Sequence, residues 1–250
     1  MINLEREFGR GRVVNTGIDE NWMASCVLGA GLAGSKAATY IPYQGNAMCF
    51  QVIQNHAGKL RSMSGGKAAM PVVFILEMTG QTPGFAGQHS DYEIDTYYAH
   101  IAGVKTVVPS TPYDAKGMMV SAIRDPNPVV YLCPAGLREL MEEVPDEQYV
   151  VPIGKARTHR EGEDISVITW GAMVYTAEEA AKQLEADGVS VEIVDLRTVL
   201  PWDKEAVLES VRKTSKALVL HEAPVTGGFG AEIAATLATE CFQDLDAPVV

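Results

Sequence analysis

The sequence predicts an α/β protein with two parallel-sheet domains and helices on both faces of each sheet. Short runs rich in Val and Ile alternate with segments of helical periodicity along the 250 residues, and this alternation is typical of parallel sheets with helical crossovers. Hydrophobic residues make up 47% of the chain, which is enough for two buried cores. A polar, irregular stretch separates the two halves. We therefore expect domains at residues 1–135 and 165–250, joined by a linker at 136–164.

In the first half, β-branched runs predict strands and helical spacing predicts the helices between them. The clearest helix begins at Thr111-Pro112, a capping residue followed by a first-turn proline, and ends at Pro126-Asn127-Pro128. The expected strands are 12–15, 37–42, 71–77, 105–109 and 129–132. The expected helices are 20–33, 47–62, 92–102 and 112–124.

The second half repeats this alternation as two βα crossovers and the start of a third. Glu178 and Lys182 are four residues apart, the spacing of an ion pair on an exposed helix surface. The last residues, "LDAPVV", read as the beginning of another strand, so we expect this domain to be incomplete at residue 250. The expected strands are 165–171, 190–196 and 217–222, and the expected helices are 174–187, 203–213 and 229–241.

Charge and cysteine spacing exclude several classes of function. The net charge of −12 argues against a nucleic-acid partner, because phosphate binding needs a basic surface. Apolar runs such as 71–76 are too short to cross a bilayer, and the first ten residues have no hydrophobic signal region. We therefore expect a cytoplasmic protein with no membrane partner. No zinc or disulfide spacing is present among the four cysteines, Cys26, Cys49, Cys133 and Cys241.

Residues 21–76 contain four basic residues and no acid, unlike the rest of this acidic chain. Burial of this segment against another subunit would explain the gap. Chance within an apolar core segment explains it equally well, so both interpretations stay open.

The stretch "GAGLAG" at 29–34 matches the glycine pattern of a dinucleotide-binding turn, but its context does not. No Asp or Glu occurs between Glu20 and Glu77, so no acid is placed to hold a ribose. The preceding "DENWMASCVL" reads as a helix capped by Asp19 rather than as a strand. We therefore expect these glycines to serve close packing and a left-handed helix stop at Gly34.

Two loops at expected strand ends carry residues capable of chemistry. "NTGIDE" leads into a helix headed by Glu20, and the glycine-rich 77–93 loop contains His89. Such loops at the carboxyl ends of parallel strands are where these sheets bind ligands. Taken singly, Glu20 is also typical of an ordinary first-turn helix acid, and His89 of a loop-capping histidine.

Six segments along nearly the whole chain carry a family resemblance: "RVVNTGIDENWMASCVLGAGLAG", "MSGGKAAMPVVF", "AGQHSD", "VVPSTPYDAKGMMVSAIRDPNPVVYL", "PIGKA" and "GGFGAEIAATL". In order and spacing they resemble the β subunit of the thiamine-diphosphate-dependent decarboxylating component of 2-oxo acid dehydrogenase complexes, of the pyruvate dehydrogenase type. The resemblance implies a transketolase-like fold, in which a pyrimidine-binding domain is followed by a transketolase carboxy-terminal domain.

The resemblance also implies the cofactor and the partners. Thiamine diphosphate would lie between this chain and an α subunit in an α₂β₂ assembly, with the α chain as the main ligand of the diphosphate and Mg²⁺. This sequence has no G-D-G…N diphosphate motif, as that division predicts. The implied reaction is decarboxylation of a 2-oxo acid and transfer of the acyl unit to a lipoyl-bearing acyltransferase.

The resemblance also implies roles for individual residues. Glu20 falls where the family keeps its cofactor-activating glutamate, whose carboxyl shares a proton with the aminopyrimidine ring. Ile18 occupies the apolar position beside that ring. His89, in "QHS", matches the family's active-site histidine, which is implied to assist proton movement or acyl transfer. A family potassium site is matched by the main-chain oxygens of Val72, Ala122, Asp125 and Asn127, although an ordinary helix stop also explains that turn.

One departure leaves the activity open. The family has an aromatic cluster after the strand at 37–42 that stacks on the pyrimidine, and here "YIPYQGNAM" offers Tyr43. An acetoin-cleaving or transketolase-like subunit therefore remains an alternative. A non-catalytic scaffold subunit with the same fold is the alternative from another class of function.

Overall fold

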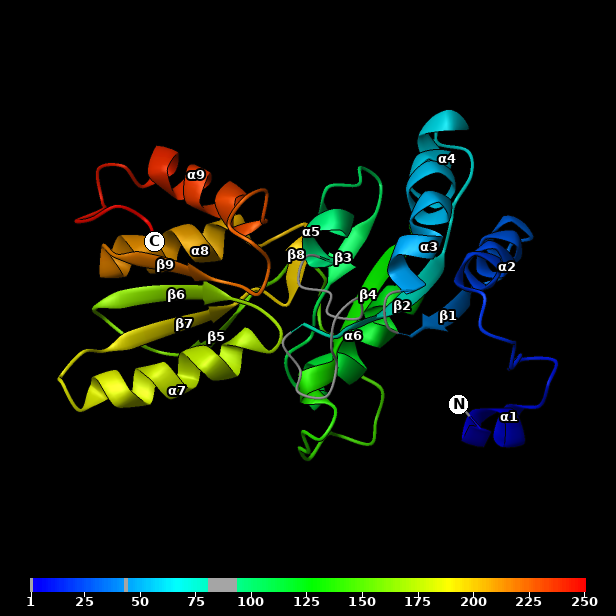
Figure 1. The fold of residues 1–250 in the computed structure, drawn as a ribbon, viewed down its shortest axis with the longest axis horizontal. Coiled ribbons are helices and arrows are strands. Elements are labelled where there is room, and N and C mark those ends of the chain that lie inside the picture. Colours follow the sequence, from blue (N-terminus) through cyan, green and yellow to red (C-terminus); the bar gives the residue numbers. More distant parts are fainter. Residues whose placement is uncertain (1, 43–44, 81–93) are drawn as a thin grey trace.

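The structure is a computed structural model and describes residues 2–42, 45–80 and 94–250. It contains two sheets, with strand orders β1-β2-β4-β3-β8 and β5-β7-β6-β9. The two sheets lie side by side along the long axis of the molecule (Figure 1), and most neighbouring strands in each are parallel. The predicted α/β class with two mainly parallel sheets is confirmed.

The first sheet has helices on both faces. Along β2, Phe74 and Leu76 join a core with α2, α3, η1 and α5, whereas Val73 on the opposite face packs with Met118 and Ala122 of α6. Its strands are β1 (Ala37–Ile41), β2 (Val72–Met78), β3 (Lys105–Val107), β4 (Val129–Pro134) and β8 (Thr198–Leu200). Its helices are α2 (Glu20–Leu32), α3 (Gly45–Gln51), π-helical η1 (Val52–Ala57), α4 (Gly58–Met63), α5 (Ile94–Ala99) and α6 (Pro112–Arg124), followed by the short 3₁₀ turn η3 (Ala135–Leu137).

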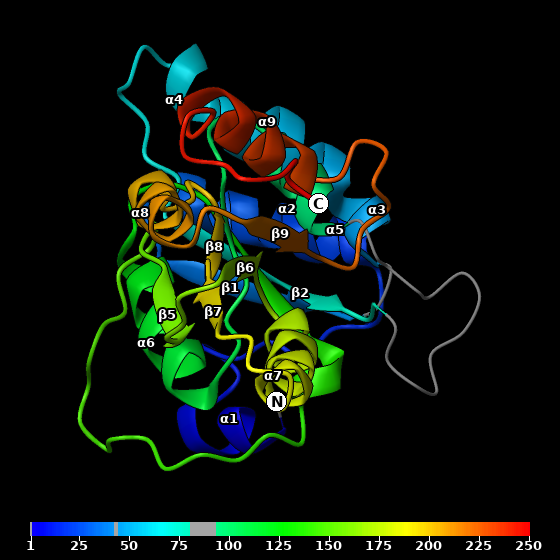
Figure 2. The same cartoon turned by 90° about the vertical axis from the view of Figure 1, so that its left-hand side faces the viewer.

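The second sheet is also covered on both faces. Helix α7 lies on one face and α8 and α9 lie on the other (Figure 2). Its strands are β5 (Arg157–Arg160), β6 (Ile165–Thr169), β7 (Val191–Asp195) and β9 (Ala217–Leu220). Its helices are α7 (Met173–Glu185), α8 (Lys204–Thr214) and α9 (Gly230–Glu240). At the free edge of β9, Val250 accepts from the amide of Val219 at 2.8 Å and donates to Ala217 at 3.1 Å, as the predicted next strand would.

Two glycines of "GAGLAG" serve packing and helix termination, as predicted, namely Gly31 and Gly34. A Cβ at Gly31 would lie 2.6 Å from Val72 Cγ1 and 2.7 Å from Met70 Sδ, so the close approach of α2 to the sheet requires glycine there. The helix ends at Leu32, and Gly34 follows with a φ of +86°.

Residues 12–15 form no strand, so that prediction is wrong. Strand β1 is the edge of the first sheet in the described part of the chain, and residues 12–15 do not extend the sheet beyond it. Instead, Arg12 donates to the carbonyl of Gly9 in a turn, and the Val14 side chain is 66% exposed. This turn follows the amino-terminal helix α1 (Ile2–Phe8), which lies apart from both sheets (Figure 1).

A buried ionic network joins the two sheets. Arg197, in the connection from β7 to β8, donates to the Asp114 carboxylate of α6 at 2.8 Å. Arg157 of β5 pairs with Asp195 at 3.2 Å, and Ser110, which follows β3, donates to the same carboxylate. Asp114 and Asp195 are fully buried, so removing a partner would leave an uncompensated charge. Strand β8 then pairs antiparallel with β3, placing a strand from the second half in the first sheet.

Burial of Asp195 predicts a pH dependence of stability. Burial raises the pKa of its carboxyl from 3.8 to about 6, although the Ser110 hydrogen bond and the Arg157 charge act in the opposite direction. Between about pH 4 and pH 6 the folded state therefore binds more protons at this group than the unfolded state does. Its contribution to the free energy of unfolding falls as the pH rises through this window and stays low above it.

Urea unfolding of the wild type and Asp195→Asn at several pH values checks this expectation. Because asparagine cannot ionise, the stability of the variant relative to the wild type should increase from about pH 4 to pH 6. A difference that stays constant across this range would contradict the raised pKa.

No helix in the described ranges is long and apolar enough to cross a membrane.

Candidate active site

Glu20 stands at the amino end of α2, beside the carboxyl end of β1. Asp19 caps the helix by accepting a hydrogen bond from the amide of Trp22 at 2.9 Å, as predicted. Helix α2 leads into β1 and runs back along it, so its first turn lies near the residues that follow Ile41. The four parallel strands of this sheet end at the same edge, where α/β proteins bind ligands.

Gly45 sets the position of the Glu20 side chain. It is the first residue of α3 and is buried against Glu20 Cγ and Cδ and against Ile41. A Cβ at position 45 would overlap Glu20 Cγ, would lie 3.1 Å from Glu20 Cδ and would lie 2.6 Å from Ile41 Cγ2. Because Gly45 has no side chain, the half-buried Glu20 carboxyl has room at this edge of the sheet.

Cys49, one turn further along α3, lies within the electrostatic reach of Glu20. Burial raises the pKa of this thiol to about 11, and the negative charge of Glu20 adds to the increase against a hydrogen bond with Tyr98. Cys49 therefore stays a neutral thiol near neutral pH and is not a nucleophile. Glu20, by contrast, is only half-buried, so its carboxyl can reach a ligand at this edge.

We expect Gly45→Ala to impair the site by displacing Glu20. The added methyl group occupies space that Glu20 and Ile41 now fill, so any reaction that uses the Glu20 carboxyl should slow by about tenfold or more. Gly29→Ala in α2 is the matched control, because a Cβ there meets nothing within 4 Å. Steady-state assays of both variants check this; equal activity in the two would show that position 45 does not orient Glu20.

Of the other predicted site residues, the structure describes Ile18 but not Tyr43 or His89. Ile18 lies two residues before Glu20 and is 80% exposed, so its side chain is available to a ligand or a partner. Tyr43 and His89 lie outside the described residues. Their predicted roles therefore stay predictions, and the structure adds Gly45 as a residue that the sequence reasoning missed.

A second carboxylate lies at the end of β2. Glu77 is 1% exposed, accepts a hydrogen bond from the Tyr40 hydroxyl of β1 at 2.9 Å and pairs with Arg138, which follows β4. These contacts join three segments at the edge of the sheet where Glu20 lies. Because its partners come from distant parts of the chain, sequence periodicity gave no sign of this cluster.

The residues predicted to bind potassium lie at the opposite edge, where β2 begins. The amide of Met70 donates to the carbonyl of Pro126 at 3.0 Å, which brings the start of β2 beside the turn after α6. These two neighbouring segments contain all four predicted residues, Val72, Ala122, Asp125 and Asn127. Among the described residues, no three His, Cys, Asp or Glu side chains gather as a metal site.

Comparisons with known proteins agree with this architecture. The family model for the transketolase pyrimidine binding domain matches residues 2–138, and the model for the transketolase C-terminal domain matches residues 154–250. The 2-oxoisovalerate dehydrogenase subunit beta 2, mitochondrial, of Arabidopsis thaliana is 41% identical over 248 residues, which cover 98% of this chain and 69% of that protein. The chain belongs to the family of 2-oxo acid dehydrogenase β subunits.

Other members of this family are equally similar. The pyruvate dehydrogenase E1 component subunit beta of Bacillus subtilis (strain 168) is 40% identical over 253 residues, covering 99% of this chain and 76% of that protein. A solved structure described as "Split gene transketolase, inactive beta4 tetramer" aligns with a TM-score of 0.80 at 24% identity, covering 99% of this chain and 76% of the other. That likeness shows the shared fold of the two domains.

Proposed function

We propose that this chain is the β subunit of a thiamine-diphosphate-dependent enzyme that decarboxylates a 2-oxo acid and transfers the acyl unit to a lipoyl acceptor. The observation that carries this proposal is the placement of Glu20. Its carboxyl is half-buried at the carboxyl edge of a parallel sheet, and the missing side chain of Gly45 leaves the room that it needs. A helix acid with only a capping role would not require glycine at a residue 25 positions along the chain.

The residues at this edge fit the pyrimidine half of thiamine diphosphate. Glu20 would share a proton with the ring, and the exposed Ile18 would contact its apolar face. Tyr43 is the proposed stacking residue and His89 the proposed proton-transfer residue. When bound, thiamine diphosphate supplies the nucleophilic carbon and the electron sink for decarboxylation.

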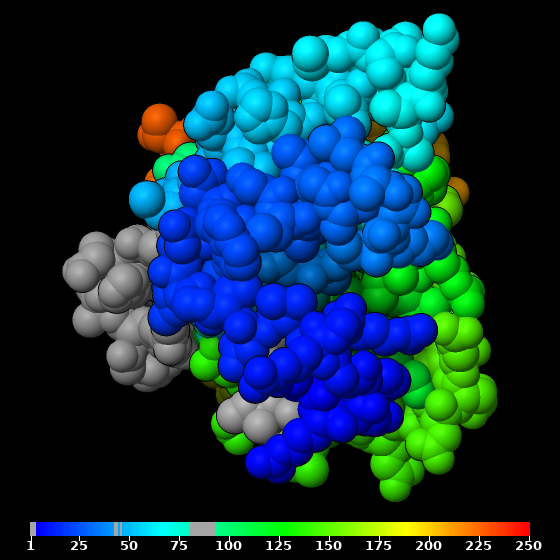
Figure 3. Space-filling model, turned by 90° about the vertical axis from the view of Figure 1, so that its right-hand side faces the viewer, coloured from blue at the N-terminus to red at the C-terminus, as the bar shows by residue number. Residues whose placement is uncertain are grey.

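We propose an α subunit as the partner that completes the site. Helix α2 exposes apolar side chains at both of its ends, with Trp22 in the turn of Glu20 at 49% exposure and Leu32 in the last turn at 60%, and Figure 3 looks onto this side of the molecule. Exposed apolar surface of this kind is typical of a subunit interface. The α chain would bring Mg²⁺ and hold the diphosphate, in an α₂β₂ assembly that passes its acyl group to a lipoyl-bearing acyltransferase.

Potassium is proposed for the turn after α6, through the main-chain oxygens of Val72, Ala122, Asp125 and Asn127. Its support is the proximity of the two segments that carry them. Carbonyl oxygens are suitable ligands for a hard monovalent cation. The ion would stabilise this turn and would take no part in the reaction.

The proposal is tested by coexpressing the chain with its α partner and assaying 2-oxo acid turnover with an artificial electron acceptor. Pyruvate and 2-oxoisovalerate cover the two substrates named in the relatives, and acetoin tests the alternative reaction. We expect thiamine-diphosphate-dependent turnover of at least one 2-oxo acid. Turnover of acetoin alone would replace this proposal with the acetoin-cleaving alternative, and a stable complex without any turnover would favour the scaffold function.

A further inference from the structure

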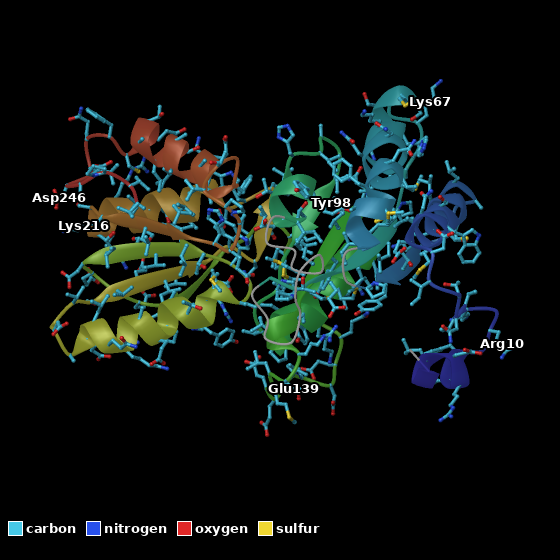
Figure 4. The ribbon with its side chains drawn as sticks, in the orientation of Figure 1. Arg10, Lys67, Tyr98, Glu139, Lys216 and Asp246 are labelled. Atoms are coloured by element: carbon cyan, nitrogen blue, oxygen red, sulfur yellow. The ribbon has the colours of Figure 1, made fainter. Side chains whose placement is uncertain are left out.

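A surface cavity of about 590 Å³ lies at the amino edge of the first sheet, the edge opposite Glu20. One wall is α4 with the turn that ends it, and Lys67, labelled in Figure 4, follows this turn. The other walls are the turns that lead into β2, β3 and β4, which contribute Met70, Gly103 and Pro128. A cavity of this size can hold a small molecule.

The lining of this cavity carries positive charge and no negative charge. Lys59 and Arg61 of α4 are its charged residues, and neither pairs with an acid in the described part of the chain. Asp125, the acid in the turn before β4, is already paired with Lys105. Both α4 cations belong to the acid-free stretch 21–76 of a chain with a net charge of −12. The local charge therefore favours an anionic ligand.

The Arg61 guanidinium is held in place across the cavity. Its Nη1 donates to Asn127 Oδ1 in the turn before β4 at 3.2 Å. The Asn127 side chain is fixed in turn, because its Nδ2 donates to Asp125 Oδ1 at 3.1 Å. A guanidinium that is ordered before binding loses less entropy when a ligand arrives, and its planar N–H groups match a carboxylate or a phosphate. This contact uses the Asn127 side chain and leaves its main-chain oxygen to the potassium proposal.

The remaining lining is largely apolar and firmly packed. Ala57 and Met70 are each 1% exposed, and Pro128 lies beside them in the lining. Helix α4 touches the turn before β3 so closely that a Cβ at Gly103 would overlap the carbonyl oxygen of Gly58. The walls are therefore fixed, and the apolar part suits the hydrocarbon body of a ligand.

We propose that this cavity binds a small organic anion, with a carboxylate or phosphate at one end and an apolar body. Arg61 binds the anionic group directly, Lys59 adds a second positive charge, and the apolar lining contacts the body of the ligand. The site lies at the edge of the sheet away from Glu20, so the inference goes beyond the proposed function and does not depend on it. It also gives part of the acid-free stretch 21–76 a role of its own.

The alternative is that Lys59 and Arg61 are ordinary solvated residues of an exposed helix. Arg61→Gln and Lys59→Gln each remove one positive charge from the lining. Lys36→Gln is the matched control, because Lys36 is exposed and belongs to the same stretch but does not line the cavity. Ala102→Leu fills the cavity without changing its charge, and Ala102 is an exposed turn residue, so the fold tolerates the larger side chain.

Nuclear magnetic resonance titration of the full chain tests the proposal. The probes are phenyl phosphate and phenylacetate, which place two different anionic groups on one ring, with benzyl alcohol as the neutral probe. Gly65, Gly66 and Gly103 line the cavity, so their amide signals report binding there. We expect saturable shifts of these signals with at least one of the two anions, and the anion that binds more tightly identifies the preferred group.

The variants separate the contributions of charge and shape. Arg61→Gln should weaken binding by about tenfold or more, as expected for loss of a charge-assisted hydrogen bond. Lys59→Gln should weaken it by about threefold, the size of an exposed charge contact. Lys36→Gln should bind within about twofold of the wild type, and Ala102→Leu should abolish the shifts.

Three results would overturn the proposal. The first is the absence of saturable shifts at these glycines with both anions, even if a synthetic peptide of the acidic 139–147 segment binds there, which would make the cavity a protein-docking surface. The second is equal affinity in Arg61→Gln and Lys36→Gln. The third is binding of benzyl alcohol as tight as that of the anions. Because none of these measurements uses turnover or thiamine diphosphate, they leave the proposed function to its own test.

Discussion

Replacing Glu20 with glutamine is expected to lower turnover of the assembled enzyme by about 10²- to 10⁴-fold, the range for loss of a positioned proton-transfer group. Glutamine has nearly the same shape and keeps the contact with Gly45, but its amide cannot exchange a proton with the cofactor ring. The loss should therefore appear in the rate of turnover. Stopped-flow and steady-state assays with the preferred 2-oxo acid measure it.

Asp19→Asn is the matched control for this substitution. Asparagine caps helices as well as aspartate does, so the contact with the Trp22 amide survives and the adjacent charge alone is lost. We expect the control to retain activity within about twofold of the wild type. Turnover by Glu20→Gln close to that of Asp19→Asn would sink the catalytic assignment of Glu20.

Asp114→Ala is expected to cause the largest loss of stability, about 3–5 kcal/mol in the free energy of unfolding. The Asp114 carboxylate is fully buried, pairs with Arg197 at 2.8 Å and lies 3.5 Å from Arg157. Its removal leaves two guanidinium groups without that anion at the junction of the two sheets. Urea denaturation followed by circular dichroism measures the change.

The exposed ion pair of Asp244 and Arg212 serves as the comparison for the buried network. Asp244 lies 3.6 Å from Arg212, with both side chains about 40% exposed or more, and such surface pairs contribute about 0–1 kcal/mol. Asp244→Ala should therefore be almost neutral. If Asp114→Ala were no more destabilising than Asp244→Ala, the buried network would not hold the sheets together.

Local signals in the sequence predicted most of the elements. Asp19 and Thr111 both cap the helices assigned to them, by accepting hydrogen bonds from Trp22 and Asp114 amides. The expected pair of Glu178 and Lys182 is present at 3.7 Å. These features depend on residues within one or two turns of each other, so the sequence pattern contains the necessary information.

Features that depend on distant residues were missed. Strand β5 lies within the predicted linker. It was not predicted because its sequence, "RTHR" at 157–160, lacks the apolar alternation of a strand. Pairing with β7 stabilises it instead. The pairing of β8 with β3 joins residues about 90 positions apart. The contact of Gly45 with Glu20 likewise joins two helices, and a glycine at position 45 reads from sequence only as a departure from an aromatic pattern.

The identity of the cofactor came from the family resemblance and not from local sequence patterns. Burial and spacing identify Glu20 as an available carboxyl at a ligand-binding edge, but they do not name thiamine diphosphate. The match of both domain models over residues 2–138 and 154–250 places that carboxyl in a family with a defined chemistry. The position of Gly45 then adds a structural reason for the orientation of this glutamate.

Calorimetric titration of thiamine diphosphate with Mg²⁺ tests the central claim most directly. It is made on this chain alone, on the complex with its α partner, and on the complex carrying Glu20→Ala. The account predicts binding only with the partner present, weakened by about tenfold or more in the variant. A well-folded complex that binds no thiamine diphosphate, or that binds it equally well without Glu20, would contradict the account.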